Sequence, residues 1–542
     1  MTGRPRVQLV WFKRDLRTVD HAALVFACQQ AEQMGHAVLA LYVIEPSIWQ
    51  QPDASFRQWQ FVEDNLNSLE QALNVLGVPL LKMLGEMPQC LDQLQRWHPI
   101  HQLWSHQETG NAASYLRDRK VQKWVKQHHI KWQELPQHPI QRGHLNRDDY
   151  ARLSHYFLQQ PVWPAPQLSP ALRACNKRLP VFEWQSSAQS GFDQWPKFWQ
   201  KLQPTRLLNE DTQRGGRERG LGCLNRFLQR DGRHYLATLA KPIDGARYSS
   251  RLSPHLAWGS LSIREVIQAV QRHLLNNPLR AHKDLAALNS RLHWQSHFMQ
   301  KLETEPEMEF FALHRHYDKL RPWSPSVLER LTAWQRGLTG MPMVDACMRC
   351  LRQRGWLPFR MRAMLVSYAS HQLWLPWQSF APYLAQLFTD YEPGIHYSQI
   401  QMQSATTGIN QMRVYNPVKQ AQEHDPKGEF IATWCPELAY VPVPLRFQPW
   451  EMHLDEQEAF GCRLGQDYPL PIVEHEAAAR HAKAELAKVR KNTEAKNLSQ
   501  AVFIKHGSRQ KTRQKTPKTS KKSLTAASKQ LSLFPDDEEI HS

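Results

Sequence analysis

The sequence lacks the features of a membrane or secreted protein. No apolar run among its 542 residues is long enough to cross a bilayer, and the N-terminus has no signal-peptide pattern. The eight cysteines are scattered, and without a secretory context free thiols are the default. We therefore expect a cytoplasmic protein that does not contact a membrane.

The sequence also lacks the usual nucleotide loops and a full set of paired cysteines. It contains no G-x-G-x-x-G motif and no Walker loop, so nothing supports a generic dinucleotide or nucleoside triphosphate site. Cys347 and Cys350 form one close pair in a helical pattern, which favours two small residues facing a core. A metal or iron–sulfur site would also need Cys435 and Cys462, and the sequence leaves that alternative open.

Positive charge, by contrast, is abundant. The formal net charge is +18, and residues 505–529 hold nine lysines or arginines and no acid. This charge predicts a polyanionic partner, of which nucleic acid is the commonest. A basic, solvated surface without a partner would give the same composition.

Hydrophobic patterning divides the chain into four regions. Residues 1–136 alternate apolar, β-rich runs with helical patterns, which predicts an open, parallel, Rossmann-like sheet in an α/β domain. Residues 137–206 are punctuated by prolines and are typical of an irregular connector. Residues 207–480 show apolar spacing near 3.6 and predict a mostly α-helical domain. Residues 485–542 are rich in Lys, Ser, Thr and Gln and are expected to be disordered.

Three features of the helical region carry candidate chemistry. Residues 248–262 place three serines and an arginine before a helix, where hydroxyls and backbone N–H groups favour phosphate. Arg360 and Arg362 are followed about thirty residues later by two acids, and a guanidinium–carboxylate pair with Asp390 or Glu392 would set the potential beside a cofactor. Clustered tryptophans can stack on a base or flavin, or relay electrons. Each feature also has a structural explanation: a capped helix start, an ion pair or core packing.

Four motifs, in order, resemble the photolyase/cryptochrome family. Residues 11–24 (WFKRDLRTVDHAAL) resemble its opening signature, and residues 249–259 (SSRLSPHLAWG) resemble its flavin-phosphate loop. Residues 338–364 resemble its central helices, and residues 415–438 resemble its closing motif. Because several motifs are long, the chain is identified as a divergent bacterial member.

The resemblance implies an α/β domain followed by a helical domain that holds FAD in a U shape. It also implies light-driven repair, in which a pyrimidine dimer is flipped into a pocket above the flavin and split by one electron from reduced, excited FAD. Carried over residue by residue, it assigns FAD contacts to Tyr235, Ser249, Ser250, Arg251, Leu252, Ser253, Trp294, Arg362, Asp390 and Glu392. It places Arg291, Arg360 and Met402 at the DNA substrate.

Several positions depart from the family pattern. Arg291 stands where repair enzymes usually carry a glutamate that hydrogen-bonds the dimer, and a donor in place of an acceptor changes lesion selectivity. Phe359 replaces an asparagine of the pocket. His396 falls where an asparagine often faces flavin N5, and it could tune the flavin as a charged or a neutral ring. Ile400 and Met402 stand where the family has two tryptophans.

These changes interrupt the family's photoreduction relay of three tryptophans. Trp377 fits its middle member and Trp323 its outer member. The inner member is missing, because the aliphatic Ile400 cannot be oxidised by excited flavin. The relay must therefore detour or fail, and the sequence does not rank the alternative donors Trp294, Trp334 and Trp356.

Two further features stay open at this stage. Residues 107–111 (QETGN) align with the region where folate-binding members place a polar pair, so a second antenna chromophore of folate or deazaflavin type is an alternative. The pentapeptide QLSLF resembles the segment by which bacterial repair and replication proteins dock on the sliding clamp. The residues that would dock are Gln530, Leu531, Leu533 and Phe534. A chance apolar patch in a basic tail is the other explanation.

We therefore expect a monomeric, light-dependent DNA photolyase, a lyase that binds ultraviolet-damaged DNA in the bacterial nucleoid. Its lesion is left open between the cyclobutane dimer and the (6-4) photoproduct. The altered pocket and broken relay favour the alternative of a cryptochrome-type blue-light photoreceptor with a signalling role. A flavin- and DNA-binding protein without photochemistry is a third alternative.

Overall fold

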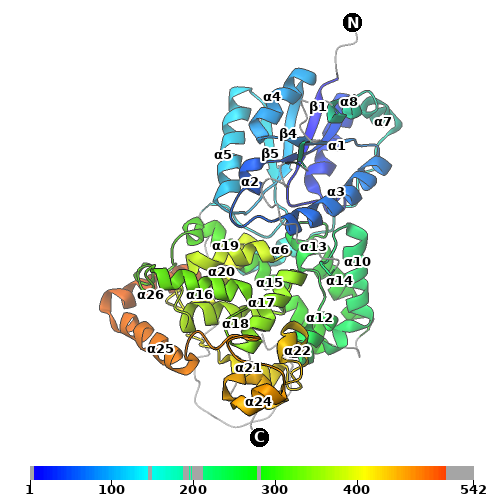
Figure 1. Ribbon diagram of the computed structural model, residues 1–542. Coiled ribbons are helices and arrows are strands. Elements are labelled where there is room, and N and C mark those ends of the chain that lie inside the picture. Colours follow the sequence, from blue (N-terminus) through cyan, green and yellow to red (C-terminus); the bar gives the residue numbers. More distant parts are fainter. Residues whose placement is uncertain are drawn as a thin grey trace, which may run out of the picture.

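The computed structural model describes residues 5–143, 149–186, 194, 195, 197, 211–277 and 282–507. These residues form an α/β domain, blue and cyan in Figure 1, and a mostly helical domain, green to orange. The predicted fold class is thereby confirmed.

The QLSLF motif lies outside the described residues. Across the described ranges, no helix combines the length and the apolar character needed to cross a membrane.

The α/β domain is built on five parallel strands. They are β1 (Val7–Phe12), β2 (Ala37–Ile44), β3 (Leu80–Leu84), β4 (Ile100–His106) and β5 (Lys131–Leu135), in the order β3-β2-β1-β4-β5. All residues of β1 and β2 are buried, as expected for strands covered on both faces. The chain reverses its direction of strand addition between β1 and β4, so a crevice forms beyond the carboxyl ends of these two strands.

Helices cover both faces of this sheet because successive strand residues point to opposite sides. Val10 and Phe12 pack against α1 (Ala22–Met34) and α3 (Phe56–Leu76). Leu9 and Trp11 pack on the other side, against α4 (Met87–Trp97) and α5 (Ala112–Gln127). A single turn of helix, α2 (Pro46–Trp49), follows β2 and borders the crevice.

The expectation of an irregular connector is wrong in part. Its described residues contain α6 (Tyr150–Gln159), α7 (Pro170–Asn176) and α8 (Val181–Ser186). Leu158 of α6 packs into the helical domain, whereas Leu172 of α7 packs under the sheet. The prolines mislead because Pro170 occupies the first turn of α7, where a missing N–H costs nothing.

The second domain is helical from residue 217. Its elements up to Leu387 are α10 (Arg217–Gln229), η2 (Asp231–His234), α11 (Tyr235–Thr238), α12 (Pro242–Tyr248), α13 (Ser253–Ala257), α14 (Ile263–Asn276), α15 (His282–Thr304), η3 (Pro306–Glu309), η4 (Arg315–Tyr317), α16 (Pro325–Arg336), α17 (Pro342–Arg354), α18 (Phe359–Ser367), the π-helical η5 (Tyr368–Gln372) and α19 (Trp377–Leu387). The elements that follow are α20 (Pro393–Gln403), α21 (Pro417–His424), α22 (Glu429–Trp434), η6 (Pro436–Leu438), α23 (Val443–Phe447), η7 (Pro449–Glu451) and α24 (Leu454–Ala459).

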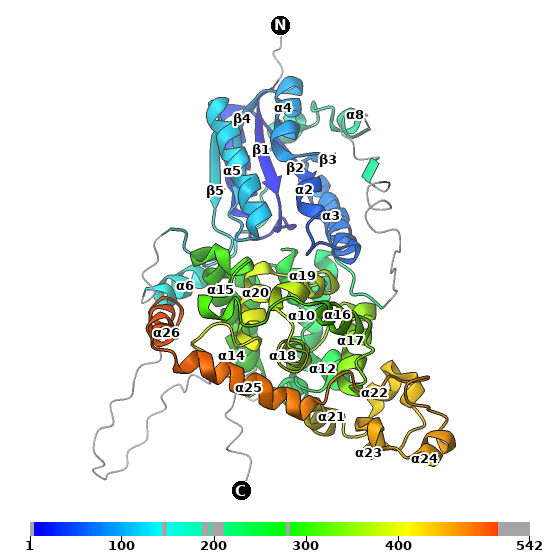
Figure 2. The same ribbon diagram turned by 60° about the vertical axis from the view of Figure 1, so that its left-hand side comes forward.

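Two further helices replace the disorder expected from residue 485. Figure 2 shows α25 (His475–Lys491) running across the helical domain towards α26 (Thr493–His506). Leu486 is buried in a cluster with Tyr317 and Ala405, and the His481 ring lies 5.3 Å from the Trp374 ring. The expectation fails because one buried leucine in a lysine- and alanine-rich segment gives almost no sequence signal.

Two arginines of the α/β domain donate hydrogen bonds to the helical domain. Arg57 of α3 donates to the carbonyl oxygens of Leu351 and Leu387 at 3.2 and 2.8 Å, and to that of Arg352. Burial lowers the pKa of Arg57 to about 10, which leaves it charged at neutral pH. Arg14 donates to the carbonyl of Ala257 at 3.0 Å. These contacts fix the crevice of the sheet against the helical domain.

Candidate functional site

A first cavity, of about 570 Å³, lies in the helical domain between α18 and α20. Apolar side chains cover most of its wall, and charged groups stand at one end. Its lining residues are Phe359, Arg362, Ala363, Val366, Phe388, Asp390, Tyr391, Glu392, Ile395, His396, Gln399, Ile400 and Gln403. Such a cavity suits a flat, mostly apolar ring with polar edges.

The charged end of the cavity is a bidentate ion pair between Arg362 and Asp390. Arg362 donates to both carboxylate oxygens of Asp390, at 3.0 and 2.9 Å, and to the carbonyl of Leu357 at 2.7 Å. Burial alone would raise the pKa of Asp390, but the Arg362 charge and hydrogen bonds outweigh it and lower that pKa. The pair therefore stays ionised and presents a fixed dipole to the cavity.

Glu392 lines the same cavity as a buried carboxyl. Burial raises its pKa to about 7, although Arg14 lies 3.8 Å away and acts in the opposite direction. One of its oxygens has no hydrogen-bond partner among the described residues. Glu392 is thus available to accept a hydrogen bond from a bound molecule.

His396 is also at the cavity wall and is neutral. Burial lowers the pKa of its imidazole to about 4. Nε2 lies 2.9 Å from the carbonyl oxygen of Ala381, which assigns the proton to Nε2 and leaves Nδ1 as an acceptor. Of the two states considered for His396, burial favours the neutral one at pH 7.

The predicted phosphate loop contacts the charged end of this cavity only through Ser253, and Arg251 lines a separate cavity with Trp356. Arg251 has a left-handed backbone (φ 54°), and its guanidinium stacks 4.2 Å from the Trp356 ring centroid. The hydroxyl of Ser249 is buried without a partner in the described part of the chain, whereas Ser253 hydrogen-bonds Asp390. An orphaned hydroxyl next to an arginine fits an anionic diphosphate. The helix that follows, α13, has only five residues, so its dipole contributes less than the sequence suggested.

The other residues assigned to substrate or flavin contact are spread over four helices. Tyr235 begins α11 and is buried, with the Arg291 guanidinium 5.4 Å from its ring. Trp294, on the same helix as Arg291, is half-buried and contacts His297 and Phe298. The guanidinium of Arg360, on α18, lies 5.7 Å from the Tyr415 ring. Met402 is half-buried near the end of α20.

The tryptophans of the expected relay do not form a chain of touching rings. Trp377 is buried, and its indole N–H has no partner among the described residues. Trp323 is 59% exposed, and the described residues contain no ring contact between it and Trp377. Trp334 is fully buried against Phe380. Ile400, the residue expected in place of the inner tryptophan, lines the cavity.

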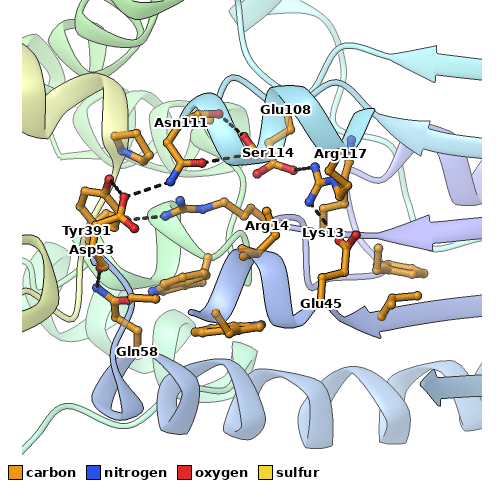
Figure 3. Close-up of a pocket in the computed structure, with 18 of the residues that line it drawn as sticks. Lys13, Arg14, Glu45, Asp53, Gln58, Glu108, Asn111, Ser114, Arg117 and Tyr391 are labelled. Atoms are coloured by element: carbon orange, nitrogen blue, oxygen red, sulfur yellow. Dashed lines mark hydrogen bonds and ion pairs between the residues drawn. The ribbon is translucent and has the colours of Figure 1, made fainter. Parts of the chain in front are cut away.

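A second cavity, of about 710 Å³, occupies the crevice at the carboxyl ends of β1 and β4, against the helical domain (Figure 3). Its aromatic walls are Trp11, Trp49 and Trp258, with Trp49 and Trp258 stacked at 6.0 Å. Its polar wall includes Glu108 and Asn111, which belong to the QETGN segment considered for an antenna chromophore. This site was expected only as a polar pair. Its aromatic walls were not expected from the sequence.

Arg117 organises the charges of the second cavity. It pairs with Glu108 at 2.6 Å, with Asp118 at 2.9 Å and with Glu45 at 3.4 Å. Burial would lower the pKa of Arg117, but these three carboxylates together raise it well above its usual value. Gly110 is needed beside Glu108, because a Cβ there would lie 2.2 Å from the Ser114 hydroxyl.

Tyr391 lines both cavities and was missed by sequence reasoning. Its hydroxyl donates to Asp53 at 2.5 Å, and Asn111 donates to the same carboxylate oxygen at 3.0 Å (Figure 3). Asp53 and Tyr391 are 338 residues apart, so no local pattern could have predicted their contact.

The four cysteines do not form a metal site. Within the described ranges, the one group with metal-ligand spacing is Asp15, His21 and His106. Hydrogen bonds already account for it: Asp15 contacts both imidazoles, at 3.0 and 2.8 Å, and accepts from the backbone of Lys13. This cluster anchors the loop after β1. The thiols that were candidates for an iron–sulfur cluster (Cys347, Cys350, Cys435 and Cys462) are all buried and free.

Comparison with known families agrees with this two-domain arrangement. The model described as "DNA photolyase" matches residues 8–145, and the model described as "FAD binding domain of DNA photolyase" matches residues 287–488. The chain belongs to the photolyase/cryptochrome family. Its helical domain is the FAD-binding domain of that family.

Several photolyase/cryptochrome relatives match over most of their length. A deoxyribodipyrimidine photo-lyase of Alkalihalophilus pseudofirmus is 27% identical over 498 residues, covering 89% of this chain and 98% of that protein. A cryptochrome DASH of Synechocystis sp. is 26% identical over 509 residues, with 89% and 98% covered. The crystal structure of a Synechocystis cryptochrome shares the fold with a TM-score of 0.76 at 24% identity, covering 89% of this chain and 100% of that one. Photolyases and cryptochromes thus match equally well.

Proposed function

We propose that the chain is a DNA photolyase that splits ultraviolet-induced pyrimidine dimers with FAD. The observation that carries this proposal is the ionised Arg362–Asp390 pair at the end of an apolar cavity, joined through Ser253 to a loop with an orphaned hydroxyl. The relatives called deoxyribodipyrimidine photo-lyase and the net charge of +18 support DNA as the substrate.

Different residues of the chain would bind FAD, exclude water and contact the lesion. FAD, when bound, supplies the one-electron chemistry. Ser249 and Arg251 would hold its diphosphate, and Arg362 with Asp390 would hold the polar edge of its ring. Ala363 and Val366 would keep water away from the ring. Arg291, Arg360 and Met402 would contact the lesion, with Arg291 donating hydrogen bonds to the pyrimidine carbonyl groups.

The test measures DNA repair by protein whose flavin has been reduced chemically. Chemical reduction makes the result independent of the interrupted tryptophan relay. Under blue light, the reduced protein should restore intact pyrimidines in DNA that carries either cyclobutane dimers or (6-4) photoproducts, and the dark sample should not. Flavin-loaded protein that restores neither lesion would contradict the proposal.

The second candidate is a blue-light photoreceptor of the cryptochrome type. Ile400 at the cavity and Arg291 in place of an acceptor favour it, since both differ from the usual repair pattern. The same experiment separates the two functions: a photoreceptor keeps its flavin and its light response but leaves both lesions unrepaired.

The cavity in the crevice supports a further part of the proposal, a second chromophore. The indole rings of Trp49 and Trp258 offer aromatic surface to a flat heterocycle, and Glu108 and Asn111 offer hydrogen bonds at its edge. A folate or deazaflavin type would fit this chemistry. An absorption band beyond those of flavin in protein purified from its own host would support it, and a flavin-only spectrum would contradict it.

We also propose that the tail docks on a bacterial sliding clamp and concentrates the protein on nucleoid DNA. The basis is the sequence alone: QLSLF provides Leu533 and Phe534 for an apolar pocket and Gln530 for register. Leu533→Ala with Phe534→Ala should abolish binding of the full chain to the clamp in a titration. Ser528→Ala with Ser532→Ala, which keeps the apolar residues, is the control. Equal affinity of the native and Leu/Phe variants would rule out docking.

A further inference from the structure

Tyr391 stands between the two cavities and carries its own proton acceptor. Its side chain lines the flavin cavity, and its hydroxyl donates to Asp53 in the wall of the crevice. Asp53 is buried, with 4% exposure, and Asn111 holds the accepting oxygen in place. The phenol and the carboxylate thus form a short, buried donor–acceptor pair at the edge of the flavin cavity.

The phenol of Tyr391 is held in its protonated form. Burial, followed by the Asp53 charge, raises its pKa well above the usual value. A phenol that loses one electron becomes a very strong acid, so its oxidation is favourable only where a base can take the proton. Asp53 provides that base at 2.5 Å without any movement of the chain.

A line of aromatic rings leads away from Tyr391. Tyr397 hydrogen-bonds Tyr391, and its ring centroid lies 6.5 Å from that of Trp377. The His396 ring, at the cavity wall, lies 5.3 Å from Tyr391 and 5.2 Å from Tyr397. Trp377 is therefore connected to the flavin cavity through two tyrosines, although Ile400 occupies the expected place of the inner tryptophan.

The other candidate donors are less well placed. Trp334 packs against Phe380 and does not line the flavin cavity. Trp356 is stacked under Arg251 and lies 5.8 Å from Arg362, and these two positive charges disfavour a radical cation on its ring. Trp294 contacts His297 and Phe298 on its own helix.

We propose that Tyr391 is the immediate electron donor to photoexcited flavin, in place of the missing tryptophan. This inference rests on the proposed binding of FAD. Tyr391 gives one electron to the excited flavin and its hydroxyl proton to Asp53, which leaves a neutral tyrosyl radical and a protonated Asp53. One electron from a soluble thiol, relayed through Trp377 and Tyr397, then restores Tyr391, and the proton returns from Asp53. The net change is one electron transferred from thiol to flavin.

The test is spectroscopic. Flavin content is first measured by visible absorbance, so that a failure to bind FAD is recognised as a failure of the proposed function and not of this inference. Flash photolysis of the oxidised flavoprotein should then yield a neutral tyrosyl radical, identified by electron paramagnetic resonance in protein labelled with ring-deuterated tyrosine. Tyr391→Phe should lose that signal. Asp53→Asn should lose it as well, because the proton acceptor is gone.

Tyr383→Phe is the matched control, because Tyr383 is a half-buried tyrosine that donates only to the Gln335 carbonyl, at 3.1 Å. The Tyr383→Phe variant should form the tyrosyl radical in the same yield as the unaltered protein. A radical that resides on tryptophan in the unaltered protein would overturn the proposal, whatever the variants do. A tyrosyl signal that survives in Tyr391→Phe would also overturn it.

Discussion

Asp390→Asn should yield a protein that is purified almost free of flavin and unfolds at a lower temperature. The substitution keeps the size of the side chain but removes the charge that both terminal nitrogens of Arg362 contact. Arg362 would then remain in the cavity wall as a half-buried, uncompensated charge, and breaking one partner of such a pair costs about 3–5 kcal/mol when both are buried. Since Ser253 also contacts Asp390, the phosphate loop would lose its link to the cavity.

The Arg349–Glu437 pair provides a matched control for that result. Its N–O distance is 2.7 Å, and its side chains are 20% and 19% exposed, against 23% and 4% for Arg362 and Asp390. It lies outside both cavities. Glu437→Gln should cost about 1 kcal/mol or less and keep the flavin. Flavin content measured by absorbance would contradict the assignment if Asp390→Asn retained the full amount.

Acidification should act on stability through buried histidines that are neutral in the folded protein. Burial lowers the pKa of His138 and His371 to about 3, and that of His255 and His396 to about 4. Between those values and the unfolded value of about 6.5, only the unfolded chain binds the protons. Stability should therefore fall as pH drops from 6.5 towards 4, by about 1 kcal/mol for each group at pH 5.5. Buried carboxyls oppose this effect. Burial raises the pKa of Glu45, Glu309 and Glu392 to about 7, so the folded chain binds their protons first and the net fall is smaller than the histidines alone would give.

The measurement is denaturant unfolding from pH 8 to pH 5. His371→Gln should reduce the dependence on pH by about one proton, because the Gln side chain can still donate to the Gln403 carbonyl but does not titrate. His155→Gln, at an exposed histidine, should leave it unchanged. A dependence on pH that His371→Gln leaves unchanged would contradict the assignment of a neutral, buried imidazole.

Much of this architecture could be predicted from the sequence because its signals are local. The five strands are apolar runs of the right length, and each was expected in its place. Arg362 and Asp390 were expected as a pair from their resemblance to the family, and the structure joins them. Continuous apolar runs and long motifs can be recognised in a single sequence, because they do not depend on contacts with distant segments.

What could not be predicted depends on contacts between distant segments. The link from Tyr391 to Asp53 exists only once the segments that precede α3 and α20 are brought together across the domain boundary. The helix α25 is stabilised by Leu486 packing into a site formed by Tyr317 and Ala405, and the lysine-rich sequence around it conceals this. The cysteines are a case in which the local pattern was enough: Cys347 and Cys350 were expected to face a core, and the fold buries both in the core of the helical domain.

The position of Arg57 has a consequence for modularity. A helix ends with carbonyl oxygens that its own backbone cannot satisfy. Here the guanidinium of Arg57 serves the last carbonyls of both α17 and α19, although Arg57 belongs to the other domain. Neither of those helix termini is complete within its own half of the chain. The two halves are thus poor candidates for separate expression, for exchange between relatives, or for a split at the connector.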